Sequence, residues 1–252
     1  NTISRFDLSS LKANNKKSIT SISKKVPQAP EVNFEKDKLA TSVSDLNPIS
    51  TPNFTPTTLA LMLDVAFTNI EFNSLLELQA SMQNSALDVP NVMKWNDDIF
   101  IAINGSNLEQ RKFISQTVID LRKVINTFEI KILQNNLMEA NFNIFSGDQQ
   151  YLINNGAEGN RCSSFQRLIY NQSGDIAKFN LYLNTDQNCI RYWNHNIKRG
   201  IINGLGMEGS TFRYTMSLFH SINLMEDFLP IDLDAIALFY HPIIKSKMNI
   251  LD

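Results

Sequence analysis

A change in composition near residue 57 decides where this chain can build a folded core. Residues 1–57 are rich in Ser, Asn, Thr and Pro, and between Asn1 and Gln28 six basic residues accompany a single acid, Asp7. Such a segment buries too little apolar surface to offset the conformational entropy that folding would remove, so alone it should be extended or disordered. We therefore predict an N-terminal arm over residues 1–57 and a folded domain over residues 58–252.

The basic residues of the arm allow two interpretations. The arm is either a plain tether or a polybasic contact for anionic lipid or an acidic partner protein. A start at Asn1 without Met fits a processed chain, with a lipoprotein-like tether after a cleavage site. The residues that would make the contacts are Arg5, Lys12, Lys16, Lys17, Lys24 and Lys25.

The overall composition excludes several classes of protein. A hydrophobic fraction of 43% over 252 residues is enough for one substantial core. The formal net charge is −2, and the arm has few aromatic side chains that could stack on bases, so we expect no nucleic-acid partner. No run of about 18 apolar residues is present that would span a bilayer.

Apolar periodicity predicts an α/β (α+β) domain with a mixed sheet, in two or three layers. Residues 99–103 alternate as a strand does, and residues 108–126 repeat apolar side chains every three or four positions, with Ser106 or Asn107 as the N-cap. The other predicted strands are residues 129–133, 141–145 and 176–183, the other predicted helices are residues 188–203 and 232–240, and residues 59–67 are a helix or a buried strand.

The same patterns predict which faces are buried. In the strand over residues 176–183, the side chains of Phe179, Leu181 and Leu183 should point to one side of the sheet. In the helix over residues 188–203, one face should carry Ile190, Trp193, Ile197 and Ile201. Asp232 is expected to cap the last helix.

Three glycines, Gly204, Gly206 and Gly209, match the spacing G-x-G-x-x-G. A dinucleotide site would need a strand before the glycines and a helix that begins at them. Here a predicted helix precedes them, so we expect them to end that helix and turn the chain.

Histidine and cysteine residues are few. His195, His220 and His241 lack the spacing that places two imidazoles on one helical face, although the fold could still bring all three together around a metal. Cys162 and Cys189 would form a disulfide in an oxidising compartment and would be two unrelated thiols in a reducing one.

The C-terminal half resembles the metzincin-type zinc proteases. Residues 197–207 are similar to the active-site helix of that family and its closing turn, residues 215–219 to its Ser-Met or Ser-Phe turn, and residues 229–240 to its last helix. The layout is also similar to that of bacterial envelope proteins of unknown function, through residues 94–105 and 240–248. The resemblance covers roughly residues 59–249 and implies a metzincin-like fold.

The chemical positions of the metzincin motif are vacant in this chain. Placing Gly206 on the motif glycine puts Arg199 and Asn203 on the two helical His positions, Gly200 on the Glu position and Gly209 on the third His position. A guanidinium stays protonated and cannot bind a metal, and glycine has no carboxylate to activate water. The resemblance therefore implies a degenerate site with no catalytic residue, no bound metal and no cofactor.

These observations lead to one expected function and two alternatives. We expect a non-catalytic structural subunit of a bacterial envelope assembly, such as an outer-membrane secretion complex, that docks through its arm in the periplasm. The partners would be other envelope proteins. The first alternative is a divergent zinc hydrolase that uses a subset of His195, His220, His241 and Glu208. The second is an envelope module that binds a ligand or peptidoglycan in the former cleft.

Overall fold

The structure is a computed structural model, and it describes residues 54–67, 91–133, 139–159, 161–165 and 168–248. The chain divides into two units, Asn1–Asp45 and Leu46–Asp252. The basic residues assigned to the arm all lie outside the described residues.

Helix α1 (Pro56–Ala66) begins at a proline and is capped by the side chain of Thr55, which accepts from the backbone N–H of Thr58. Of the two alternatives for residues 59–67, the helix is therefore correct.

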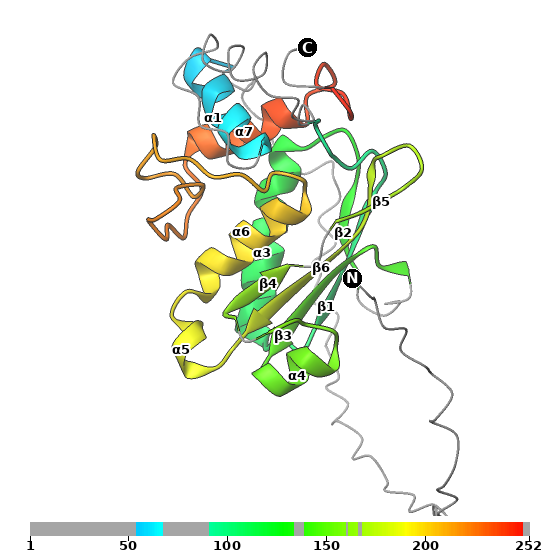
Figure 1. Cartoon of the computed structure of the whole chain (residues 1–252), viewed down its shortest axis with the longest axis vertical. Helices are drawn as coiled ribbons and strands as arrows, with labels where there is room; N and C mark the ends of the chain where they lie inside the picture. The colour runs from blue at the N-terminus through cyan, green and yellow to red at the C-terminus, as the bar shows by residue number, and fades with distance from the viewer. Residues whose placement is uncertain (1–53, 68–90, 134–138, 160, 166–167, 249–252) are drawn as a thin grey trace, which may run out of the picture. The chain divides into compact units, whose positions relative to one another are not determined.

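A mixed sheet of six strands within the described residues forms the centre of the second unit (Figure 1). Its strands follow the order β2-β1-β3-β6-β4, and β5 also pairs with β6. Strands β2, β1, β3 and β6 run parallel to one another, whereas β4 and β5 run antiparallel to β6. The strands are β1 (Ile99–Asn104), β2 (Ile130–Ile132), β3 (Phe142–Gly147), β4 (Ser163–Phe165), β5 (Ile169–Tyr170) and β6 (Ile176–Asn184).

Side-chain alternation buries the face of β6 that the sequence predicted. Phe179, Leu181 and Leu183 are all at most 2% exposed and lie on one face of β6. Phe142 pairs with Phe179 in the register of β3 and β6, and their rings lie 5.0 Å apart. The mixed α/β class predicted from periodicity is confirmed.

Helices α3 (Leu108–Val124) and α6 (Trp193–Gly204) pack beside each other on the sheet (Figure 1). Asn107 is the N-cap of α3, because its side chain accepts from the N–H of Gln110 and the Gln110 side chain accepts from the N–H of Asn107. Helix α7 (Pro230–Phe239) packs against α1 and the end of α3. The short helix α4 (Gln149–Asn154), like β4 and β5, was not predicted.

The prediction of one helix over residues 188–203 was wrong, because the chain forms two helices there. Helix α5 (Gln187–Ile190) ends before Arg191, and α6 begins at Trp193. The break rotates Ile190 away from the apolar face, so its side chain is 48% exposed instead of buried. A disulfide joins Cys162 to Cys189 in α5 and ties this region to the residues before β4.

The C-terminus of α6 is closed by a glycine, as the sequence predicted. Gly206 has a φ of +94°, and the N–H groups of Gly206 and Met207 donate to the carbonyl oxygens of Asn203 (2.9 Å) and Ile202 (3.3 Å). This is a Schellman motif. Two buried side chains also bind the terminal carbonyl groups: the indole of Trp95 donates to Gly204 (2.7 Å) and the hydroxyl of Tyr240 to Leu205 (2.6 Å).

Replacing Gly206 with Ala should destabilise the protein far more than replacing Gly159. Both glycines have positive φ, +94° and +74°, so each substitution carries a backbone cost of about 1 kcal/mol. A Cβ on Gly206 would lie 2.1 Å from the backbone oxygen of Met93, whereas a Cβ on Gly159 would meet nothing within 4 Å. Urea denaturation of both variants measures the difference, and equal losses would contradict the close packing of this turn.

Candidate functional site

The chain passes from α6 to α7 through residues 205–229, a long connecting segment without a helix or strand (Figure 1). Irregular segments of this length are uncommon in compact domains and are often functional. Their backbone polar groups still need partners wherever they are buried. Side chains from α6, α1 and α7 supply these partners, and together they define the candidate site.

Arg199 of α6 holds the first part of the connecting segment. Its guanidinium donates to the carbonyl oxygens of Met207 (3.4 Å), Glu208 (3.5 Å) and Gly209. The same group lies 5.2 Å from the centroid of the Phe219 ring. Burial lowers the pKa of Arg199 to about 10, against the opposing charges of Asp232 and Glu208, so the group is a fixed cation at neutral pH.

Asp232 of α7 organises the second part of the segment and is fully buried. Its carboxylate accepts from the hydroxyl of Ser217 (2.5 Å) and from the N–H groups of Leu218 (3.1 Å) and Leu229 (2.9 Å). Burial raises the pKa of Asp232, while these hydrogen bonds and the nearby Arg199 charge oppose that rise. The sequence placed Asp232 at the start of the helix, but α7 begins two residues earlier, and Asp232 caps it from the third helical position by accepting from the N–H of the N-cap Leu229. Asp232 also binds a turn more than ten residues away along the chain.

Helix α1 provides a third anchor through Asp64, which is 4% exposed. Asp64 accepts from the hydroxyl of Thr211 (2.8 Å) and forms an ion pair with Arg213 (3.4 Å). The N–H of Gly209 donates to the carbonyl oxygen of Val65 (2.8 Å), and a Cβ on Gly209 would lie 2.3 Å from the backbone oxygen of Asp64. Glycine at this position therefore allows the segment to lie directly on the end of α1.

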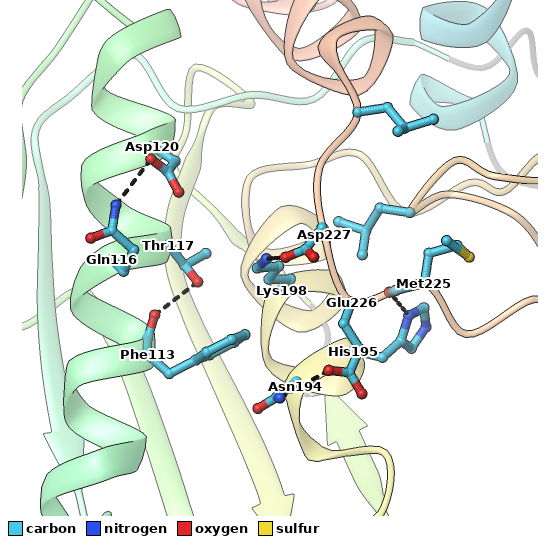
Figure 2. Close-up of polar contacts among 12 residues, drawn as sticks. Phe113, Gln116, Thr117, Asp120, Asn194, His195, Lys198, Met225, Glu226 and Asp227 are labelled. Carbon is cyan, nitrogen blue, oxygen red and sulfur yellow. Dashed lines mark hydrogen bonds and ion pairs between the residues drawn. The ribbon is translucent and has the colours of Figure 1, made fainter.

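A fourth anchor fixes the end of the segment to the N-terminal half of α6 (Figure 2). Asn194 donates to Glu226 (3.0 Å), and Nδ1 of His195 donates to the carbonyl oxygen of Met225 (2.7 Å). Lys198 forms an ion pair with Asp227 (3.0 Å). Burial lowers the pKa of His195, with the Met225 hydrogen bond opposing that shift.

Lys198 is an unusual part of this anchor because its side chain is only 8% exposed, whereas that of Asp227 is 93% exposed. The ammonium lies 5.1 Å from the ring centroid of Phe113 on α3 and 5.2 Å from that of Phe228. A cation between two aromatic rings gains an electrostatic attraction that partly replaces its lost hydration. The sequence does not predict this contact, because a lysine among the polar residues of α6 gives no sign of its partner.

Between these anchors the connecting segment turns large apolar side chains outward. Phe212 is 55% exposed, Met216 58%, Ile222 70% and Leu224 46%. We call these four residues the exposed apolar set. Buried charges therefore hold in place a segment that still exposes large apolar side chains.

The structure brings together some of the degenerate motif positions. Arg199 and Gly209, which the resemblance placed on two metal-binding positions, are in direct hydrogen-bond contact. Asn203 lies one turn after Arg199 on α6, and among the described residues its Oδ1 is buried with no hydrogen-bond partner. Gly200 is buried within α6, and Gly206 forms the turn after it. The G-x-G-x-x-G sequence stands at the end of α6, so these glycines end a helix, as expected.

The three histidines do not meet at one site. The Nδ1 atom of His220 accepts from the N–H of Asn223 (2.9 Å), and that of His241 accepts from the N–H of Ile243 (3.3 Å), so both rings support local turns. Among the described residues, no three His, Cys, Asp or Glu side chains lie where they could hold one metal ion. Within the same residues, no helix is both long enough and apolar enough to cross a membrane.

Together, the fold and the site define a mixed α/β protein in which buried charges hold a long connecting segment against the central helix. No protein-family model matches the sequence, and no curated protein sequence matches it. The solved structure of myroilysin matches 60% of this chain and 83% of its own, with 10% identity and a TM-score of 0.37. A likeness at this level carries no inference about family or chemistry.

Replacing Arg199 with Met should loosen the connecting segment. The change removes the donor of three carbonyl oxygens and leaves Asp232 buried without a nearby cation, which should cost about 3 kcal/mol. Lys at this position keeps the charge but loses the planar fork, so its loss should be smaller. Urea denaturation measures both losses, with Arg191→Met as an exposed control. An Arg199→Met variant as stable as the control would contradict the role of this anchor.

His195 should make the stability of the protein fall on acidification. Its pKa in the folded protein lies below the ordinary value of 6.5, so below that pH the unfolded chain takes up a proton more readily than the folded one. The free energy of unfolding should therefore decrease more in the wild type than in His195→Asn between about pH 7.5 and about pH 5. His241→Asn is the exposed control. Identical pH profiles for wild type and His195→Asn would contradict this assignment.

Proposed function

We propose that this chain is a non-catalytic structural subunit of a bacterial cell-envelope assembly, and that the connecting segment and the N-terminal arm are its docking surfaces. The observation that carries the proposal is the exposed apolar set on a segment held in place by buried charges. Apolar and aromatic side chains at the centre of an interface supply most of the binding energy in protein complexes. The surrounding anchors reduce the conformational entropy that binding would otherwise cost.

The non-catalytic part of the proposal is supported by the position of Arg199. The resemblance to metzincin-type proteases assigns this position to a metal ligand, and here a protonated guanidinium binds the backbone of residues 207–209. A cation fixed in this way repels a metal ion. It also binds the backbone of the loop that would otherwise carry the third metal ligand. We therefore infer a degenerate protease-like site that Arg199 holds closed.

The envelope location is supported by the disulfide between Cys162 and Cys189. Disulfides persist in oxidising compartments such as the bacterial periplasm and are rare in the cytosol. A periplasmic subunit could also approach the anionic surface of a membrane through the basic residues of the arm. In its specific form, the proposal is that the chain associates with the outer membrane and belongs to a secretion complex.

Variants of the full-length chain test the two docking surfaces separately. One variant replaces Phe212, Met216 and Ile222 with Ser, and a matched control replaces Leu108, Ile153 and Ile169, which are 47–58% exposed, with Ser. A third variant replaces the six basic residues of the arm with Gln. Each tagged chain is purified from detergent-solubilised envelopes, and its partners are quantified by mass spectrometry.

The first and third variants should each lose at least about tenfold of the co-purifying envelope proteins, because a central apolar or charged contact contributes more than about 1.4 kcal/mol. The matched control should keep them. Retention of all partners by both variants, with the circular dichroism spectrum of the wild type, would contradict the proposal.

A further inference from the structure

The middle of the connecting segment, residues 211–223, folds back on itself. The N–H of Thr211 donates to the carbonyl oxygen of Phe219, and the N–H of Ser221 donates to the carbonyl oxygen of Thr211, each at 3.0 Å. We call residues 211–223 the outer lobe, which is orange in Figure 1 and lies to the left of α6. Its internal hydrogen bonds bring side chains from its two ends to the same part of the surface.

Three members of the exposed apolar set belong to the outer lobe. The ring centroid of Phe212 lies 6.2 Å from that of His220, and Nδ1 of His220 accepts from the N–H of Ile222 (3.2 Å). The side-chain amide of Asn223 donates to the carbonyl oxygen of the residue before Met216 (2.8 Å). These contacts tie together the stretches that carry the three apolar side chains, which are 55–70% exposed. The fourth member of the set follows the lobe directly.

The acidic side chains next to the outer lobe face solvent, whereas the cations are buried or paired. The side chain of Asp227 is 93% exposed, and that of its partner Lys198 is 8% exposed (Figure 2). Glu226 and Glu208, which stand after and before the lobe, are also exposed. Arg213, in the lobe itself, is paired with a buried carboxylate of α1 at 3.4 Å. The charge that this surface presents to a partner is therefore negative.

This combination of groups restricts the chemistry of the partner. Large apolar side chains at the centre of an interface supply most of its binding energy, and the charges around them select the partner. A purely apolar partner would remove the carboxylates from water without pairing them, which is costly. An anionic lipid surface would be repelled by them. A partner that fits carries apolar side chains with lysine or arginine beside them.

We propose that the outer lobe binds a basic amphipathic segment of a partner protein. The apolar side chains of that segment pack on Phe212, Met216 and Ile222, and its cations pair with Glu226 and Asp227. This inference rests on the docking role proposed above and names the chemistry of the partner at that surface. The two can fail separately, because the chain could join an assembly while its outer lobe binds no basic segment.

A synthetic peptide of Leu and Lys tests the proposal with the purified full-length chain. The peptide has about 18 residues, or about five helical turns, with Leu every three or four positions and Lys between them. Fluorescence anisotropy of the labelled peptide should show saturable binding, with a dissociation constant of roughly 10 µM or below. A peptide with Glu in place of Lys and a peptide with Ser in place of Leu should each bind at least about tenfold more weakly.

Two variants identify the groups that bind the peptide. Replacing Phe212, Met216 and Ile222 with Ser should weaken binding at least about tenfold, whereas the Ser variant of the three exposed apolar residues outside the segment should bind as the wild type does. Glu226→Gln combined with Asp227→Asn should weaken binding at low salt and remove most of its salt dependence.

The matched control for the charges is Glu109→Gln combined with Glu158→Gln, two exposed acids outside the segment, which should keep the wild-type affinity. If the variant at 226 and 227 does not fold, Glu226→Gln alone decides the question.

Three results would overturn the proposal: equal binding of the Glu peptide, unchanged affinity in folded variants of the outer lobe, or binding to phosphatidylglycerol vesicles that depends on Phe212, Met216 and Ile222. Loss of envelope proteins by the Ser variant without any binding of the basic peptide would overturn this partner chemistry and leave the docking role intact. Binding of the peptide as predicted, with no envelope protein co-purifying, would contradict the assembly role instead.

Discussion

The partly buried cation Arg199 and the fully buried anion Asp232 are the charges on which the C-terminal half of the molecule depends. The chain leaves α6 and reaches α7 through residues 205–229 without forming a helix or strand. A buried irregular backbone is stable only if its N–H and C=O groups find partners. Arg199 binds the carbonyl groups at the start of the segment, and Asp232 binds the N–H groups further along it. Because both charges lie in a low dielectric and oppose each other's pKa shift, neither would be tolerated as well alone.

Local sequence patterns predicted the elements of the central domain but not the contacts that hold the connecting segment. The periodicity of residues 99–103, 108–126 and 176–183 identified β1, α3 and β6, because each has one clearly buried face. Strands β4 and β5 are too short to show a period. The apolar pattern runs without interruption across the break between α5 and α6, so it does not predict the break. Most anchors join distant residues, and Asp64 and Thr211 are 147 positions apart, so no local pattern pairs them.

The candidate site, too, could be predicted from the sequence only in part. The resemblance assigned Arg199, Gly200, Asn203 and Gly209 to the chemical positions of the metzincin motif, and that assignment stays a prediction. What Arg199 does instead could not be read, since its partners are backbone carbonyl groups that any residue would supply. Likewise, the sequence alone allowed either a disulfide or two free thiols. The fold brings Cys162 and Cys189 together as a disulfide.

The central claim is that the chain serves an assembly through its surface and carries no catalytic metal. The most direct measurement is native purification of the tagged chain from detergent-solubilised envelopes, with protein stoichiometry and zinc determined in the same eluate. The account predicts several envelope proteins at a fixed ratio to the chain and no stoichiometric zinc. A free monomer that carries one zinc ion per chain would contradict it, and His195, His220 and His241 would then be the residues to replace.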